Sequence, residues 1–182
     1  MHTDATNGLT AILVFGAMLA VHGLGDLWIQ TQHQASHKGL HTHRGQWACA
    51  RHVTTYTAAT LVATLAVLAL PLGIHASVLG IAAGQAFSAV THYAVDRRWT
   101  LARLAHWAGK TELHRLGQPR GLHVHAVHIT ATATTRGGQL HTAEETVLVP
   151  LDNPVLGTGA HSLDQSLHVG ALFVSALLTA LI

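Results

Sequence analysis

Four long apolar stretches constrain the fold of this chain more than any other feature of its sequence. They cover about residues 9–29, 52–70, 73–95 and 163–182. A helix needs about 20 mostly apolar residues to cross the hydrocarbon core of a bilayer, and each stretch approaches or reaches that length. The sequence therefore predicts four transmembrane helices.

The composition of the chain agrees with a location in a membrane. The 182 residues are 49% hydrophobic and only 10% charged, whereas about a quarter of the residues are charged in an average soluble domain. This length fits one domain, and the single Cys49 excludes an internal disulfide. We therefore expect one all-α membrane domain over residues 1–182, with its helices in a bundle.

The basic residues predict how such a bundle is oriented. All ten Lys and Arg lie in the two long connections, between the first and second stretches and between the third and fourth. The positive-inside rule places both connections in the cytoplasm and both termini outside, as in a multi-pass protein of a bacterial inner membrane. Basic residues beside a bilayer attract anionic lipid headgroups. No helix-turn-helix or zinc-finger pattern points to a specific nucleic acid.

The second connection, residues 97–160, has two patterns of its own. Residues 98–116 combine an apolar face with basic residues, which is typical of an amphipathic helix at a membrane surface. Residues 122–149 alternate between apolar and polar around Arg136-Gly137-Gly138, which predicts a β-hairpin. The expected fold is thus a four-helix membrane bundle with a cytoplasmic amphipathic helix and an inserted hairpin.

Three of the four stretches carry a His and an Asp that are four residues apart. The pairs are His22 with Asp26, His92 with Asp96, and Asp164 with His168. Residues i and i+4 of a helix lie on one face, one turn apart. Ionisable groups in membrane helices are costly, so they are usually paired and often functional.

The alternating direction of the stretches places the three pairs at one depth. His precedes Asp in the first and third stretches, which run toward the basic side, and the order is reversed in the fourth, which runs away from it. We therefore expect the three Asp at one level and the three His about 6 Å deeper, from the helical rise of about 1.5 Å per residue. His52 opens the second stretch at the same side, so we expect one interior site with His52 at its edge.

Imidazole and carboxylate groups in one place suit Zn, Mn, Fe or Ni. The predicted metal ligands are His22, Asp26, His52, His92, Asp96, Asp164 and His168. In a metal-dependent membrane enzyme, a metal-bound water would be the nucleophile of a hydrolysis, and Asp26, Asp96 or Asp164 would serve as its base. Two alternatives stay open. The groups could carry or relay metal ions or protons, or the pairs could only hold together a structural or regulatory membrane module.

Four segments of the chain, taken in order, carry a resemblance to a known family. They are HGLGDLWIQTQ from His22, the apolar stretch that opens with His52, HYAVDRR from His92 and LDQSLH from Leu163. Together they resemble a bacterial and phage family of small integral membrane proteins, domain of unknown function 3307, from about residue 20 to the end of the chain. The resemblance implies a four-helix integral membrane fold. It implies no reaction and no cofactor.

Overall fold

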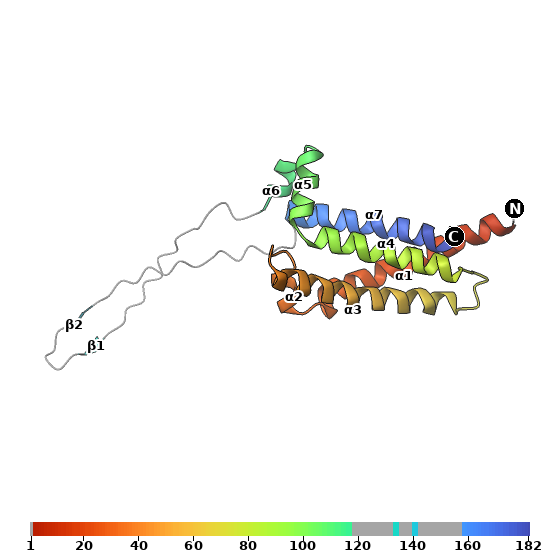
Figure 1. Ribbon diagram of the computed structural model, residues 1–182, viewed down its shortest axis with the longest axis horizontal. Helices are drawn as coiled ribbons and strands as arrows, with labels where there is room; N and C mark the ends of the chain where they lie inside the picture. Colours follow the sequence, from red (N-terminus) through yellow and green to blue (C-terminus); the bar gives the residue numbers. More distant parts are fainter. Residues whose placement is uncertain (1, 118–132, 135–139, 142–157) are drawn as a thin grey trace.

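Four long helices lie side by side in the computed structural model, which describes residues 2–117, 133–134, 140–141 and 158–182. The helices are α1 (His2–Leu24), α3 (His43–Leu68), α4 (Val78–Asp96) and α7 (Gly159–Leu181) (Figure 1). Both α3 and α7 pack against α1 and α4. The four helices therefore close into one bundle, with Val14, Met18, Tyr56, Leu172 and Ala176 buried at its core.

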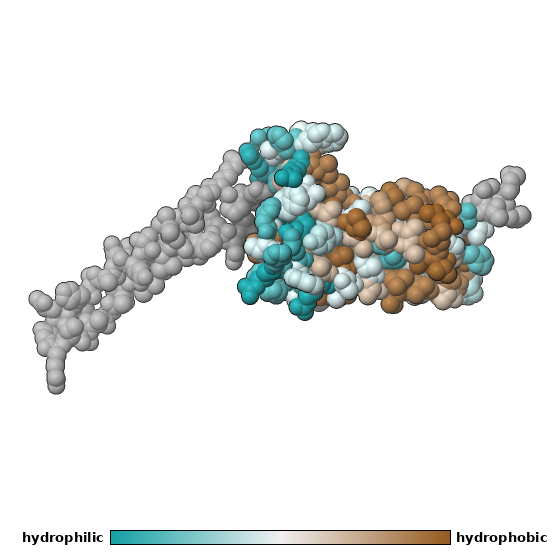
Figure 2. Space-filling view, viewed as in Figure 1, coloured by the Kyte–Doolittle hydropathy of each residue, from teal (hydrophilic) through white to brown (hydrophobic). Residues whose placement is uncertain are grey.

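Three of the helical segments are long and apolar enough to cross a membrane. They are Ala5–Ile29, Val78–Asp96 and Gly159–Leu181. Figure 2 shows hydrophobic residues over most of the visible face of the bundle and hydrophilic residues gathered at the end that holds α2 (Gln32–His37). Large apolar side chains such as Ile12, Val62 and Val90 are exposed on the outside of the bundle. A contiguous apolar surface of this kind suits contact with lipid.

The predicted second span, residues 52–70, covers the C-terminal part of α3 and two residues beyond its end at Leu68. This helix is not among the three segments. The helix begins earlier than predicted, because the Thr42 hydroxyl caps it and accepts a hydrogen bond from the Gly45 amide at 3.2 Å. Its first turns therefore hold Arg44 and Arg51, and five threonines follow between Thr54 and Thr64. These residues lower its hydropathy, so four spans are not confirmed by length and composition.

The starts of α4 and α7 also differ from the predicted boundaries. The third span was expected from residue 73, but α4 begins at Val78 after Ser77, whose hydroxyl accepts from the Gly80 amide at 2.8 Å. The fourth was expected from residue 163, but α7 begins at Gly159 because Thr158 caps it. A side-chain cap fixes where a helix starts, and a pattern of apolar residues does not show it.

Two glycines bring α4 close to α7. A Cβ atom on Gly80 would lie 2.7 Å from the carbonyl oxygen of Thr179, and one on Gly84 would lie 2.6 Å from that of Ser175. Neither position has room for a larger residue. Glycines four residues apart allow helix backbones to approach closely in a membrane, and here they join two helices of one chain.

The predicted amphipathic helix over residues 98–116 is two short helices instead. They are α5 (Trp99–Trp107) and α6 (Thr111–Arg115). The chain turns between them at Gly109, whose φ of 68° is a conformation that favours glycine. Leu101 and Ala105 of α5 are buried, and α6 packs against α7. Both short helices therefore lie at the hydrophilic end of the bundle.

Of the predicted hairpin over residues 122–149, the structure describes only four residues. β1 (Ala133–Thr134) pairs antiparallel with β2 (Leu140–His141). This two-residue ladder is too short to support the predicted hairpin, and the rest of the segment lies outside the described residues.

Candidate metal centre

The end of the first span is a π-helical turn, η1 (Gly25–Ile29), which follows α1 directly. Turns of this type are frequent at functional sites. It carries Asp26 beside the last turn of α1, with Asp26 Oδ2 3.7 Å from His22 Nε2. A Cβ atom on Gly25 would lie only 3.2 Å from a ring carbon of Tyr56. The glycine therefore allows α3 to approach the turn that holds Asp26.

The seven residues predicted as metal ligands come together at the hydrophilic end of the bundle. They come from α1, η1, α3, α4 and α7, and they are His22, Asp26, His52, His92, Asp96, Asp164 and His168. The four imidazoles and Asp96 are buried, whereas the side chains of Asp26 and Asp164 are 12% and 22% exposed. The structure thus places all seven in one cluster, and their roles in metal binding or catalysis stay predictions.

Four of these residues, His52, His92, Asp26 and Asp96, form a central set in which ligand atoms converge. The two Nε2 atoms of His52 and His92 lie 3.0 Å apart. Asp26 Oδ1 lies 3.1 Å from His52 Nε2 and 3.6 Å from His92 Nε2, and Asp96 Oδ2 lies 3.3 Å from both. A tetrahedral ion with ligands at about 2.0–2.1 Å spaces those ligands by about 3.3–3.4 Å. The distances from the two imidazole nitrogens to each other and to each carboxylate oxygen are therefore close to the ligand spacing around one tetrahedral ion.

The carboxylate oxygens of the central set lie close to imidazole nitrogens without a well-aligned hydrogen bond to them. Asp26 Oδ1 and Asp96 Oδ2 are buried and have no hydrogen-bond partner among the described residues, and the same holds for Nε2 of His22 and His168. A buried polar atom without a partner costs about 1–3 kcal/mol. A cation among these atoms would satisfy them, which favours metal binding over a set of simple hydrogen-bonded pairs.

The remaining predicted ligands flank the central set on two sides. His22 approaches the second oxygen of Asp26. On the other side, His168 Nε2 lies 3.6 Å from Asp164 Oδ2 and 3.8 Å from Asp96 Oδ1. Among the residues that the structure describes, three groups could hold an ion: His22 with Asp26 and His92, His52 with His92 and Asp96, and Asp96 with Asp164 and His168. Asp26 and Asp96 each connect the central set to a flank through their second oxygen.

His52 lies in the middle of the cluster, which corrects the prediction that it would be at the edge. Its Nε2 atom is within 3.3 Å of carboxylate oxygens of both Asp26 and Asp96. The reason is the early start of α3 at His43, which puts His52 well inside the helix instead of at its first residue.

Lys38 is a member of the cluster that spacing in the sequence did not indicate. Its Nζ atom lies 2.8 Å from Asp96 Oδ1. The Arg97 guanidinium donates to the carbonyl oxygens of Lys38, at 2.9 Å, and Leu40, at 2.6 Å. These bonds hold the segment after α2 against the end of α4. They thereby place the Lys38 ammonium group where it offsets the negative charge of Asp96. As a loop residue Lys38 carries no periodic signal, and its contact depends on the tertiary fold.

Tyr56 closes the cluster on the side of the bundle core. Its ring stacks on His92 with a centroid distance of 3.9 Å, and its hydroxyl lies 3.4 Å from the Ser88 hydroxyl. Sequence reasoning also missed this residue, although it follows His52 by four positions and so lies on the same helix face.

Comparisons of the chain with protein-family models, with curated proteins and with solved structures found no match. The chemistry of the cluster is therefore inferred from its own geometry.

Proposed function

We propose that this chain is a four-span integral membrane enzyme that binds a divalent metal ion in the central set and uses it for hydrolysis at the cytoplasmic face. One observation carries the proposal. The two imidazole nitrogens of the central set lie 3.0–3.6 Å from each other and from two carboxylate oxygens, and these two oxygens lack hydrogen-bond partners in the described residues. Imidazole nitrogen and carboxylate oxygen together suit Zn, Mn, Fe or Ni.

The number of ligands favours catalysis over a purely structural metal site. A catalytic zinc site has three protein ligands and leaves one position to water. His52, His92 and Asp96 form such a set of three, with Asp26 Oδ1 3.1 Å from His52 Nε2. His22, Asp164 and His168 then remain beside the ion to bind a second ion or to handle protons. Asp164 is the most exposed of the three cluster carboxylates, so with a metal bound it would be the residue that serves as a base toward water. Such a site can be reached from the hydrophilic end of the bundle.

Inward-facing polar residues support α3 as the fourth span. The Thr60 hydroxyl donates to Gln85 Oε1 at 3.0 Å, and Gln85 Nε2 donates to the Thr64 hydroxyl at 3.2 Å. All three residues are buried between α3 and α4. Polar groups in a membrane must find partners within the protein. The low hydropathy of α3 therefore reflects its inner face, while Val62 and Leu65 are exposed on its outer face.

The proposal is tested on the purified full-length protein in detergent. We expect at least one Zn, Mn, Fe or Ni ion per chain by elemental analysis after growth with each metal. Hydrolysis of model carboxylate and phosphate esters should stop on treatment with a chelator and return with the metal. Protein that is folded but takes up none of the four metals would overturn the proposal.

A polar seam along α3 and α4 favours proton or metal-ion relay as a second candidate function. From the cluster it continues through Tyr56 and Ser88, and then through Thr60, Gln85 and Thr64. Hydrogen-bonded side chains inside a membrane bundle are one way to move protons. Ester hydrolysis in detergent, where no gradient exists, would support the enzyme. Ion flux in vesicles without any hydrolysis would support the relay.

A further inference from the structure

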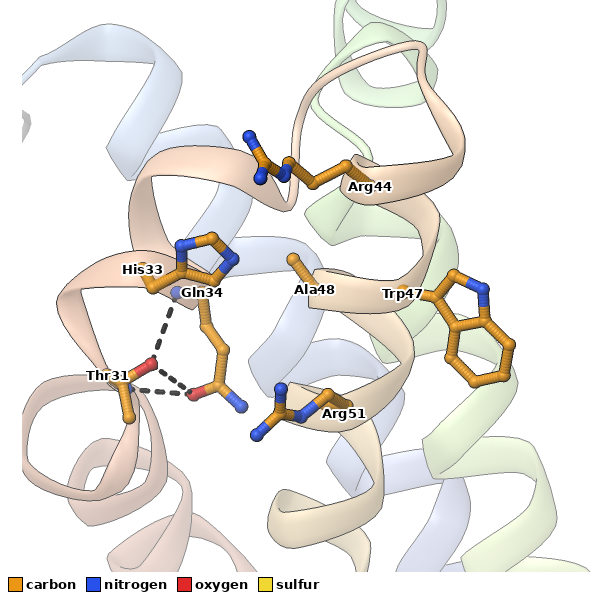
Figure 3. Close-up of a pocket in the computed structure, with 7 residues that line it drawn as sticks. All are labelled: Thr31, His33, Gln34, Arg44, Trp47, Ala48 and Arg51. Atoms are coloured by element: carbon orange, nitrogen blue, oxygen red, sulfur yellow. Dashed lines mark hydrogen bonds between the residues drawn. The ribbon is translucent and has the colours of Figure 1, made fainter.

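A basic pocket lies on the outer side of the bundle, apart from the metal ligands. It has a volume of about 280 Å³ and lies between α2 and the first turns of α3. Its lining includes His33, Gln34, Arg44, Trp47, Ala48 and Arg51 (Figure 3). No carboxylate lines it. The pocket therefore has a positive charge that nothing in its own wall offsets.

The two arginines of this pocket are arranged as anion ligands. Arg44, Ala48 and Arg51 share one face of α3, because they are spaced i, i+4 and i+7. Both guanidinium groups extend toward α2, one on each side of His33 and Gln34 (Figure 3). Within the described part of the chain, neither guanidinium makes a hydrogen bond or an ion pair. Two free guanidinium groups therefore line the pocket at its two ends (Figure 3), and guanidinium groups bind phosphate oxygens well.

Gln34 adds a fixed hydrogen-bond donor to the arginines. Its Oε1 atom accepts from the Thr31 amide at 2.8 Å and from the Thr31 hydroxyl at 3.2 Å. These bonds are part of the capping box that starts α2. They leave the amide Nε2 directed toward Arg51 (Figure 3). The pocket thus offers three donor groups and is anchored by the local structure of α2.

A second cavity on α3 has room for an apolar tail attached to the anion. It has a volume of about 330 Å³ and lies one turn further along the helix, lined by Val53, Thr54, Thr57, Ala58, Leu61 and Ala89. Arg51, Thr54 and Ala58 are spaced i, i+3 and i+7, so one face of α3 joins the two cavities. Beside them Trp47 is 70% exposed, as aromatic residues at the boundary of a membrane are.

We infer that the basic pocket binds the phosphate headgroup of an anionic glycerophospholipid, and that one acyl chain of this lipid lies in the groove along Thr54 and Ala58. The inference does not depend on the metal or on the proposed hydrolysis. It names a specific binding site for an anionic lipid. The general attraction of basic loops to a membrane does not define such a site.

The test measures binding of phosphatidylglycerol to the full-length protein in detergent by native mass spectrometry. Phosphatidylcholine and inorganic phosphate are the competing probes. The double variant R44Q/R51Q should bind phosphatidylglycerol at least about tenfold more weakly, since two charge-assisted contacts are lost. The matched control K110Q/R115Q removes two exposed basic residues from the same end of the bundle and should bind it as the native chain does.

A further variant separates the headgroup from the tail. Ala58 is exposed in the groove, so A58W should weaken the binding of long-chain phosphatidylglycerol and leave that of a short-chain form unchanged. Equal losses in R44Q/R51Q and in the control would show that only net charge matters and would overturn the inference. It would also be overturned if inorganic phosphate displaced the lipid at equal concentration, because the ligand would then be a free phosphate. If the variants change lipid binding as expected but the protein contains almost no metal, only the proposed enzyme function is contradicted.

Discussion

At the scale of single residues, Asp96 decides between a metal site and structural pairing. One of its oxygens belongs to the central set, and the other meets His168 and Lys38. We expect Asp96→Asn to lose most of the bound metal, because an oxygen that would contact the ion directly and a negative charge are removed together. The measurement is elemental analysis of purified protein, with Glu112→Gln as a control that changes an exposed carboxylate outside the cluster. If the pairs are only structural, neither protein will hold metal.

Substitution of Lys38 should raise the affinity for the metal, whereas substitution of Asp96 should lower it. Its ammonium group lies 2.8 Å from an Asp96 oxygen, so it would repel a divalent ion bound to the same carboxylate. We expect Lys38→Met to raise the affinity for the metal several-fold in a competition titration against a chelating dye. Weaker metal binding in this variant would show that Lys38 supports the site by holding the segment after α2 in place.

Metal occupancy should fall as the pH falls. Imidazole binds a metal only when its coordinating nitrogen is free of a proton, and His ordinarily titrates near pH 6.5. The cluster contains four imidazoles, so protons compete with the metal for these nitrogens as the pH falls. We expect full occupancy at about pH 7.5 and substantial loss by about pH 5 in equilibrium dialysis at fixed free metal. Occupancy that stays constant over this range would exclude histidine ligands.

Helical spacing was enough to predict which His and Asp residues come together. It was not enough to predict the arrangement of these residues within the cluster. The i,i+4 pairs and their reversed order in the fourth stretch place His22, His92 and His168 at one depth without any tertiary information. The central position of His52 follows from a cap at Thr42. The contact of Lys38 follows from the hydrogen bonds of Arg97. Neither the cap nor these bonds is visible in hydrophobic periodicity.

At the scale of helices, the contact between α4 and α7 is the packing most sensitive to substitution. We expect Gly84→Leu to lower the thermal midpoint of the protein in detergent by several degrees, because its side chain would meet the backbone of α7 at Ser175. Gly16→Leu is the matched control, since a Cβ at Gly16 in α1 has no neighbour within 4 Å. Equal thermal midpoints in the two variants would mean that α4 and α7 do not pack closely.

The existence of the long helices was easier to predict than their ends. Runs of apolar residues identified the stretches that became α1, α4 and α7, because length and hydropathy are properties of the segment itself. Their boundaries depend on single hydroxyl groups at Ser77 and Thr158. The division of residues 98–116 into α5 and α6 depends on the positive φ of Gly109.

At the scale of the whole molecule, the basic residues and the His/Asp cluster lie at the same end of the bundle. The described basic residues of the two long connections lie at the hydrophilic end that holds the cluster (Figures 1 and 2). From the positive-inside rule we predict that the cluster and the basic pocket face the cytoplasm. A reporter that is active only in the cytoplasm should work when it is fused after Arg115. Activity of an external reporter at that position would reverse the orientation.

The status of α3 fixes how many times the chain crosses the membrane, and the positions of the two termini report it. With α3 as a fourth span, the number of crossings is even and both termini lie on the same side; with three spans they lie on opposite sides. We expect the same side, because α3 runs the length of the bundle beside α1 and α4 (Figure 1) and pairs its buried polar groups with Gln85.

Tags placed before Met1 and after Ile182 are tested for protease access in sealed cells and in inverted vesicles. Both tags, and a protease site placed at Gly73, should be cleaved in the first preparation and protected in the second. Cleavage of only one terminal tag in either preparation would mean that α3 lies outside the membrane. Gln85 of α4 would then lack the hydrogen-bond partners that α3 provides within the bundle.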